Sequence, residues 1–453
     1  MVASSVTLPA AHTNFAAGNA TLTNADVVAL DRANVFHSWS AQKALNPMAI
    51  AGGSGSTVWD HEGNTYLDFS SQLVNTNIGH QHPKVIAAIA QQATSLATVA
   101  PAHANHVRAT AAAKILSHAP AKMEKVFFTN GGADANENAI RMARLHTGRD
   151  KVISRYRSYH GNTGSAIVAT GDWRRIPNEY ARGHVHVFGP YLYRSEFWAE
   201  TPEQETERAL QHLRRVIQAE GPQSIAAVLL ETVPGTAGIL VPTPGYLEGV
   251  RALCDEYGIV MILDEVMAGF GRTGDWFAFD AFNVTPDLIT FAKGVNSGYV
   301  PVGGVIISGE IAATFDERVF PGGLTYSGHP LAAASVVASI EAFEEEDIVG
   351  NAARIGREHL EPGLSALAEK HNVIGEVRGR GVFWALELVQ DRSTKAPVTA
   401  DYMSRLKAEL LRLGLLPFIA DNRVHVVPPA VVTAAEVAQA LAVYDQALGT
   451  VTL

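Results

Sequence analysis

Two apolar runs in this chain end in charged side chains that could do chemistry together. The run 260–263 leads into Asp264 and Glu265, and the run 290–292 leads into Lys293. Each run is typical of a strand buried on both faces. Because parallel strands end at one edge of a sheet, we expect Asp264 and Lys293 to lie in one crevice there. Single charges at loop starts are more often solvated surface groups, so the pair needs support from other motifs.

A glycine-containing loop gives the first support. Gly131, Gly132 and Ala133 lie between a predicted strand at 125–129 and a predicted helix at 135–145. The backbone N–H groups of such a loop, together with the positive end of the helix, favour an anion such as a phosphate. The loop has neither the spacing of a Walker A motif nor that of a dinucleotide fingerprint.

The exit loop of the next predicted strand carries Tyr159 and His160. A tyrosine at this place can lie flat against a planar ring. Asp264 could keep a ring nitrogen protonated, Val266 could pack on the opposite face of the ring, and Lys293 could bond covalently to an aldehyde. A phosphate cup, an aromatic ring, an acid and an amine at the ends of successive strands together favour pyridoxal phosphate as the cofactor.

Composition narrows the class of protein. The chain has 453 residues, is 47% hydrophobic and carries a net charge of −10, which argues against broad binding of nucleic acid or anionic membranes. Its single cysteine, Cys254, excludes a disulfide framework and lies in a predicted helix, which favours a buried thiol; no metal site is expected. Without a signal-peptide pattern or a membrane-length apolar run, we expect a cytoplasmic protein.

Helices and strands alternate from about residue 105 onward, which is typical of βαβ units and a mostly parallel sheet covered on both faces. After the acidic segment 344–347 the pattern becomes α+β. We therefore predict an N-terminal arm with part of a small domain at 1–75, a large cofactor-binding domain at 76–340 and a C-terminal small α+β domain at 341–453. Seven strands of the large domain are predicted, at 125–129, 151–155, 167–169, 226–231, 260–264, 288–292 and 303–307.

Four motifs resemble the class III (ω-amino acid) aminotransferases, a family of pyridoxal-phosphate enzymes. They are LDEVMAGFGRTG at 263–274, FAKG at 291–294, NGGADANE at 130–137 and YHG at 159–161. The resemblance runs from about residue 35 to about residue 449, and the first motif is highly specific. It implies a fold-type I α/β architecture, transamination with ping-pong kinetics, and a homodimer with sites at the subunit interface; pairing of dimers into a tetramer stays open.

The same resemblance implies particular site residues. Lys293 is the catalytic lysine, and Thr325 should reach the cofactor phosphate of the other subunit. The predicted cofactor-binding residues are Gly132, Ala133, Tyr159, His160, Glu231, Asp264, Val266, Lys293 and Thr325. The predicted substrate-binding residues are Phe36, Trp39, Val74, Tyr159, Arg423 and His425.

The predicted substrate pocket departs from the family pattern. Glu231 matches a family glutamate that pairs in some members with an arginine near the C-terminal Pro-Pro, but His425 stands at that place here. Arg423 lies two residues earlier, on the same face of a predicted strand. The arginine of amine:pyruvate members would fall near Phe418. Acid binding by Arg423 with His425 as helper, and a structural role for both, stay equally open.

Short segments at 36–40 and 423–429 are most similar to the taurine:pyruvate branch of the family, and a paired Arg and His would suit a sulfonate. We therefore predict transfer of an amino group from an ω-amino acid, a taurine-like donor or an amine to pyruvate or a related oxo-acid. The preference between pyruvate and 2-oxoglutarate stays open. The alternatives are an aminomutase or decarboxylase on the same fold, for which no external acceptor is needed, and a less favoured non-catalytic binding protein.

Overall fold

The computed structural model describes residues 22–453, which fall into two compact units. The first holds the described residues up to Gly52 together with Trp59–Thr65, and the second holds Gly53–Val58 and Tyr66–Leu453. In the first unit, helix α1 (Asn24–Asn34) begins with a capping box, and a short 3-10 turn η1 (Gln42–Ala44) follows. The domain boundaries near residues 75 and 340 stay predictions.

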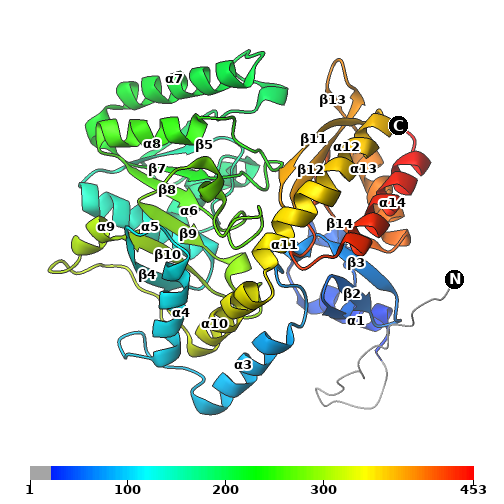
Figure 1. The fold of residues 1–453 in the computed structure, drawn as a ribbon, viewed down its shortest axis with the longest axis horizontal. Coiled ribbons are helices and arrows are strands. Elements are labelled where there is room, and N and C mark those ends of the chain that lie inside the picture. The colour runs from blue at the N-terminus through cyan, green and yellow to red at the C-terminus, as the bar shows by residue number, and fades with distance from the viewer. Residues whose placement is uncertain (1–21) are drawn as a thin grey trace. The chain divides into compact units, whose positions relative to one another are not determined.

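A seven-stranded sheet forms one part of the second unit (Figure 1). Its order is β4-β10-β9-β8-β7-β5-β6; β10 is antiparallel to both neighbours, and the other pairs are parallel. The predicted seven-stranded, mostly parallel sheet is confirmed. Its strands are β4 (Met123–Thr129), β5 (Lys151–Arg155), β6 (His184–Val187), β7 (Ile225–Glu231), β8 (Val260–Asp264), β9 (Leu288–Phe291) and β10 (Gly303–Ser308).

Both faces of this sheet are covered. Met261 and Leu263 of β8 pack into one hydrophobic core, whereas Val260 and Ile262 pack into another, since successive side chains of a strand point to opposite faces. Cys254 is buried as predicted, and burial raises its pKa to about 12. The helices that accompany the sheet are α4 (His106–Ser117), α5 (Gly132–Thr147), α6 (Gly164–Ala169), α7 (Pro202–Glu220), α8 (Tyr246–Tyr257), α9 (Gly309–Ala313) and α10 (Pro330–Glu345).

One predicted strand is wrong. The apolar run 167–169 belongs to helix α6, and the seventh strand is β6 instead. A run of this length does not separate a strand from a buried helix by its periodicity. The carboxylate of Glu137 caps α6 from another helix, because it accepts hydrogen bonds from the N–H groups of Ser165 (2.7 Å) and Ala166 (3.1 Å). That contact is distant in sequence, so the local pattern could not show it.

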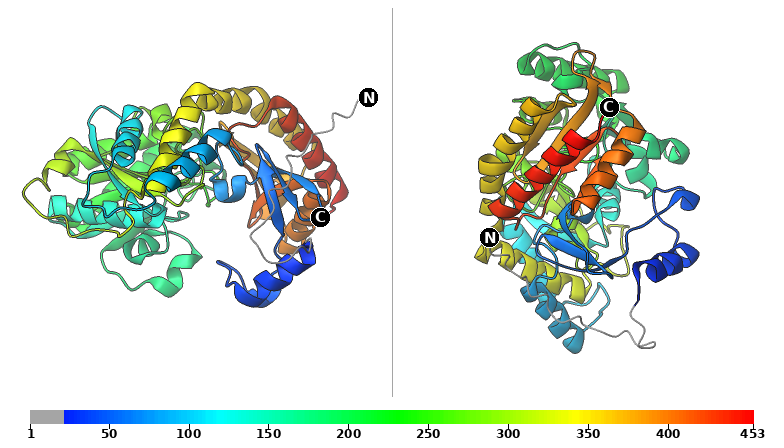
Figure 2. Two further views of the ribbon diagram at one scale, coloured as in Figure 1. Left: turned by 90° about the horizontal axis from the view of Figure 1, so that it is seen from below. Right: turned by 90° about the vertical axis from the view of Figure 1, so that its right-hand side faces the viewer.

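A second sheet follows the order β1-β2-β3-β14-β15-β12-β11, with β13 paired to β12. Figure 2 shows the helices from α10 to α12 running as one series from the seven-stranded sheet to this one. Among residues 22–453, no helix is both long and apolar enough to cross a membrane. The strands are β1 (Ile50–Ser54), β2 (Thr57–Asp60), β3 (Thr65–Phe69), β11 (Ile374–Arg380), β12 (Phe383–Asp391), β13 (Ala396–Pro397), β14 (Leu415–Ala420) and β15 (Arg423–Val426). The remaining α-helices are α2 (Ser71–Val74), α3 (Pro83–Ser95), α11 (Ile348–Ile355), α12 (Glu361–Lys370), α13 (Ala400–Arg412) and α14 (Ala434–Thr450).

Candidate active site

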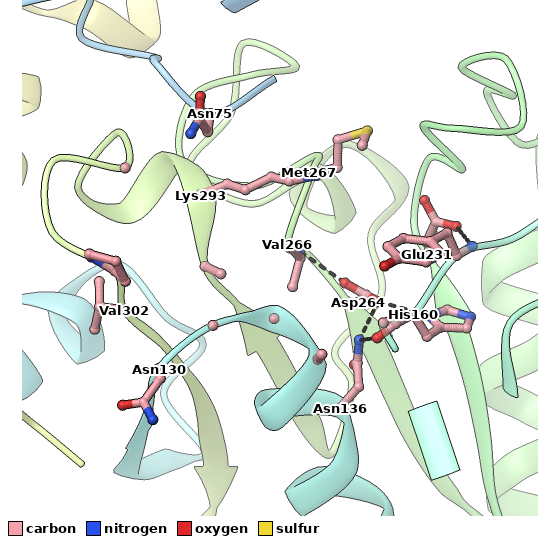
Figure 3. Close-up of a pocket in the computed structure, with 18 of the residues that line it drawn as sticks. Asn75, Asn130, Asn136, His160, Glu231, Asp264, Val266, Met267, Lys293 and Val302 are labelled. Carbon is pink, nitrogen blue, oxygen red and sulfur yellow. Dashed lines mark hydrogen bonds and ion pairs between the residues drawn. The ribbon is translucent and has the colours of Figure 1, made fainter. Parts of the chain in front are cut away.

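The carboxyl ends of three neighbouring strands bring the predicted chemical groups together. Asp264 ends β8 and lies beside Glu231, the last residue of β7, and beside Thr290 of β9. Lys293 follows β9 at the start of the turn η6 (Lys293–Val295). Figure 3 shows Lys293, Asp264, Val266 and Glu231 around one cavity. The volume of this cavity is about 330 Å³. The lining residues are Asn75, Asn130, Gly131, Gly132, Ala133, Asn136, Tyr159, His160, Gly161, Glu231, Asp264, Val266, Met267, Ala292, Lys293, Asn296, Gly298, Pro301 and Val302.

Asp264 is buried and surrounded by hydrogen-bond donors. Its Oδ2 accepts from His160 Nδ1 at 2.8 Å and from Asn136 Nδ2 at 2.7 Å, and its Oδ1 accepts from the Val266 N–H at 3.0 Å. In all three bonds the carboxylate oxygens act as acceptors, so the carboxyl group needs no proton of its own to make them. The contact also requires the proton of the His160 ring to lie on Nδ1 when that ring is neutral. The site therefore holds a fixed negative charge at the end of β8.

Lys293 is partly buried and lines the same cavity. Burial lowers the pKa of its ammonium group to about 8, against the attraction of Asp264 and Glu231, which raises it, while the charges of Arg272 and Arg174 lower it further. Its backbone φ of 42° lies in the left-handed region, which residues other than glycine rarely adopt. Such strain is typical of functional positions held by their surroundings. The amine can thus lose its proton near neutral pH and act as a nucleophile or base.

Helix α5 presents its N-terminus to the cavity. It begins at Gly132, and its first N–H groups have no acceptor within the helix. A Cβ atom on Gly132 would lie 2.8 Å from Val266 Cγ1, and one on Gly161 would lie 2.5 Å from the Cβ of Ala133. The glycines therefore let the loops after β4, β5 and β8 approach one another closely. The result is a compact wall of the cavity that Lys293 also lines, and the N–H groups of this wall can bind an anion.

Tyr159 and Glu231 are joined through the backbone. The buried Glu231 carboxylate accepts from the N–H groups of Tyr159 (3.0 Å) and Gly235 (2.8 Å), and burial raises its pKa. Across the Tyr159 ring lies Arg174, whose guanidinium carbon is 3.9 Å from the ring centroid.

Several predicted site residues do not line the cavity. His425 is fully buried, and burial together with the charge of Arg423 holds its pKa well below the ordinary value. Arg423 donates from Nη2 to the Asp421 carboxylate at 2.5 Å. Val74 is buried in the apolar cluster that Met267 packs against, and Thr325 is exposed. The substrate or cofactor roles of these residues stay predictions.

Two further predicted substrate residues belong to the first unit. The side chains of Phe36 and Trp39 are exposed there. Their predicted role in substrate binding also stays a prediction.

Two polar residues that sequence reasoning left without a role complete the network around Asp264. Thr290 Oγ1 donates to Asn136 Oδ1 at 2.8 Å, which turns the Asn136 amide so that its Nδ2 reaches Asp264. A signal was present, because Asn136 follows the glycine loop by one helical turn and Thr290 is a polar residue within an apolar strand. What the sequence lacked was the pairing of these two positions.

The donor set fits pyridoxal phosphate. A buried carboxylate can keep a pyridine nitrogen protonated, an amine of lowered pKa can bond to an aldehyde, and a helix N-terminus can hold a phosphate. Asp264, Lys293 and the loop 130–133 bring groups of these three kinds around a single cavity. The fold and the site therefore define an enzyme of the pyridoxal-phosphate class.

Comparison with known proteins gives the family. The model of the class III aminotransferases matches residues 39–448. The chain is 33% identical to the taurine–pyruvate aminotransferase of Bilophila wadsworthia, with 95% of this chain and 98% of the relative covered. The chain belongs to the class III aminotransferase family, and its cofactor is pyridoxal phosphate.

Solved structures agree with this assignment. A taurine:2-oxoglutarate aminotransferase from Bifidobacterium kashiwanohense, in complex with PLP and glutamate, has a TM-score of 0.91 at 42% identity, with 94% of this chain and 98% of that chain covered. An (S)-enantioselective ω-transaminase from Thermomicrobium roseum also has a TM-score of 0.91, at 35% identity, with 96% and 100% covered. The fold-type I prediction is thereby confirmed.

Proposed function

We propose that this enzyme transfers an amino group from an ω-amino acid, a taurine-like compound or an amine to pyruvate or a related oxo-acid. The observation that carries the proposal is the Lys293 amine of lowered pKa, which shares one cavity with the buried Asp264 carboxylate. The names of the relatives support the substrate class, because taurine aminotransferases and an ω-transaminase are among them.

The residues divide the work between binding and proton transfer. Bound pyridoxal phosphate supplies an electron sink for the carbon that carries the amino group. Asp264 keeps the pyridine nitrogen protonated, and His160 and Asn136 hold its carboxylate in place. Lys293 Nζ takes a proton from the donor carbon in one direction and returns it in the other, since its pKa of about 8 suits both states near neutral pH.

The same proposal includes the assembly. The enzyme is a homodimer, and Thr325 of one subunit contacts the phosphate bound in the other. Support comes from the exposure of Thr325 and of its neighbour Tyr326, which is 62% exposed although it is large and aromatic. An exposed aromatic of this kind is favoured at interfaces between subunits.

Lys293→Ala tests the central residue. The variant should lose turnover with every donor and should lose the absorbance of the covalently held cofactor, because no other amine takes the place of Lys293 Nζ. The control is circular dichroism of both proteins, which should be equal. Turnover of the wild-type enzyme should require an oxo-acid and give parallel double-reciprocal plots. Full activity of the variant, or turnover without an acceptor, would contradict the proposal.

A further inference from the structure

We infer that Arg174, held by Asp172 against the Tyr159 ring, binds the carboxylate or sulfonate group of the amino donor. The inference rests on the proposed function, since it assigns a residue to the acid group of the substrates proposed above. It assigns a role to a residue that the sequence analysis did not single out.

The cavity needs a cation for an acidic donor. Its walls carry two buried carboxylates, Glu231 and Asp264, which repel the acid group of an incoming donor. The only amine that the lining residues supply is Lys293, which the reaction itself uses. An acidic donor therefore requires an additional positive charge close to the cavity wall.

Three other basic side chains are poorly placed for this task. Arg272 is fully buried and donates to the carbonyl oxygens of Val382 and Pro428 and to Asn77, so it serves the packing of the chain. Arg423 lies against Gly238, which is not a cavity residue, and is paired with Asp421. His425 is buried with its ring at 4.8 Å, edge to face, from Phe418, and its lowered pKa keeps it neutral.

Arg174 is in direct contact with the cavity wall. Its guanidinium carbon lies 3.9 Å from the centroid of the Tyr159 ring, and Tyr159 lines the cavity. Its positive charge also reaches the reaction centre, because it contributes to the lowered pKa of Lys293. A planar guanidinium that stacks on an aromatic ring by its face binds a carboxylate or sulfonate by its edge, in bidentate fashion.

Asp172 gives this side chain a fixed position. Arg174 Nε lies 3.1 Å from Oδ1 and 3.0 Å from Oδ2 of Asp172, and Nη2 donates to the same carboxylate. Asp172 also caps the turn η2 (Trp173–Asn178) through the backbone N–H of Arg174. The pair is partly exposed, at 14% and 23% of the two side chains, so an incoming anion can compete with Asp172 at modest cost.

The test compares acidic and neutral donors in the pyridoxal-phosphate-loaded enzyme. With pyruvate as acceptor, Arg174→Gln should raise KM for taurine and β-alanine about tenfold or more, since a charge-assisted hydrogen-bond pair is lost. KM and kcat for 1-phenylethylamine, which has no acid group, should change less than about twofold. Arg174→Lys keeps the positive charge but lacks the planar guanidinium that binds two oxygens at once. It should give an intermediate KM for the acidic donors.

Matched variants control for charge and position. Arg175→Gln removes the same charge one residue away, where the side chain pairs with Glu179, and should leave all donors unchanged. Arg423→Gln should not separate acidic from neutral donors.

A binding measurement separates this inference from the proposed function. Calorimetry with propanesulfonate, which has the acid group but no amine, should show about tenfold weaker binding to Arg174→Gln than to the wild-type holoenzyme. If the wild type turns over none of the donors, the proposed function fails, while the propanesulfonate result still decides the role of Arg174. Equal losses for acidic and neutral donors, unchanged propanesulfonate binding, or a selective loss in Arg423→Gln alone would overturn the inference.

Discussion

Glu265 is a buried residue next to the active site that makes the stability of the folded protein depend on pH. Its carboxyl group is fully buried and accepts hydrogen bonds from Thr232 Oγ1 and from the Ala278 N–H (2.8 Å). Burial nevertheless outweighs these bonds and raises its pKa from 4.5 to about 7. Between pH 4.5 and about 7, Glu265 is therefore protonated in the folded protein but ionised in the unfolded chain.

The sign of the pH dependence follows from this raised pKa. The stability that Glu265 contributes is present in full below pH 4.5 and is lost as the pH rises to about 7. Glu265→Gln removes the titration and keeps a similar shape. The unfolding free energy of the variant, relative to wild type, should rise between these two pH values by on the order of 3 kcal/mol and stay level above pH 7.

Thermal denaturation of both holoenzymes across pH 5 to pH 9 measures this difference, with Glu62→Gln, an exposed carboxylate, as the matched control. A constant gap between the Glu265→Gln variant and wild type across that range would show that Glu265 is ionised in the folded enzyme.

Residue patterns predicted that Asp264 and Lys293 share one cavity but not the contacts around them. Asp264 and Lys293 could be placed together because each ends an apolar strand, and parallel strands share one edge. The contacts of Asn136 with Asp264 and of Arg174 with Tyr159 join segments that no local pattern relates. They depend on how helix and loop pack in three dimensions, which a single sequence does not specify.

At the scale of elements, the start of α5 is fitted to the exit of β8. Gly132 leaves no room for a side chain, because its Cβ would lie 2.8 Å and 2.9 Å from the two methyl groups of Val266. The helix N-terminus and the loop after β8 therefore form one wall of the cavity. A displacement of α5 would therefore change the position of its N-terminus relative to Lys293.

Gly132→Ala should weaken both folding and cofactor binding. An added methyl group in a packed position costs about 1–3 kcal/mol, and we expect a comparable loss in the binding free energy of pyridoxal phosphate. Val266→Ala in the same chain removes the clashing methyl groups and should restore part of both losses. Thermal midpoints and cofactor titrations of the two single variants and the double variant give the coupling energy, which should be about 1 kcal/mol or more. Strictly additive losses would mean that the two residues do not meet.

Helices and strands were predicted correctly where the length of a segment and its pattern of apolar residues indicated the same element. The prediction failed where a segment was too short for this. The long series of helices and strands gave the seven-stranded sheet, since βαβ units leave few other arrangements. The short run 167–169 was assigned to the wrong class, because its helix depends on a cap from Glu137 in α5. Short apolar runs need such tertiary information before they can be assigned.

At the scale of the whole molecule, the proposed dimer makes each active site depend on two chains. Thr325 is exposed in the single chain, as a residue that serves another subunit would be. Thr325→Val should therefore weaken binding of pyridoxal phosphate about tenfold, by loss of one hydrogen bond to an anion. Two differently tagged chains, one with Lys293→Ala and one with Thr325→Val, allow the hybrid dimer to be purified.

The hybrid dimer shows whether Thr325 contacts the cofactor of its own subunit or that of the partner subunit. If Thr325 crosses to the partner, the site with intact Lys293 receives an intact Thr325 from the Lys293→Ala chain, and half of the sites regain wild-type cofactor affinity and turnover. If Thr325 serves its own chain, each site of the hybrid carries one of the two defects, so none regains wild-type behaviour. Cofactor titration and activity per subunit, measured beside both homodimers, decide between these outcomes. A protein that stays monomeric in sedimentation at micromolar concentration would contradict the proposed dimer itself, since the hybrid could then not form.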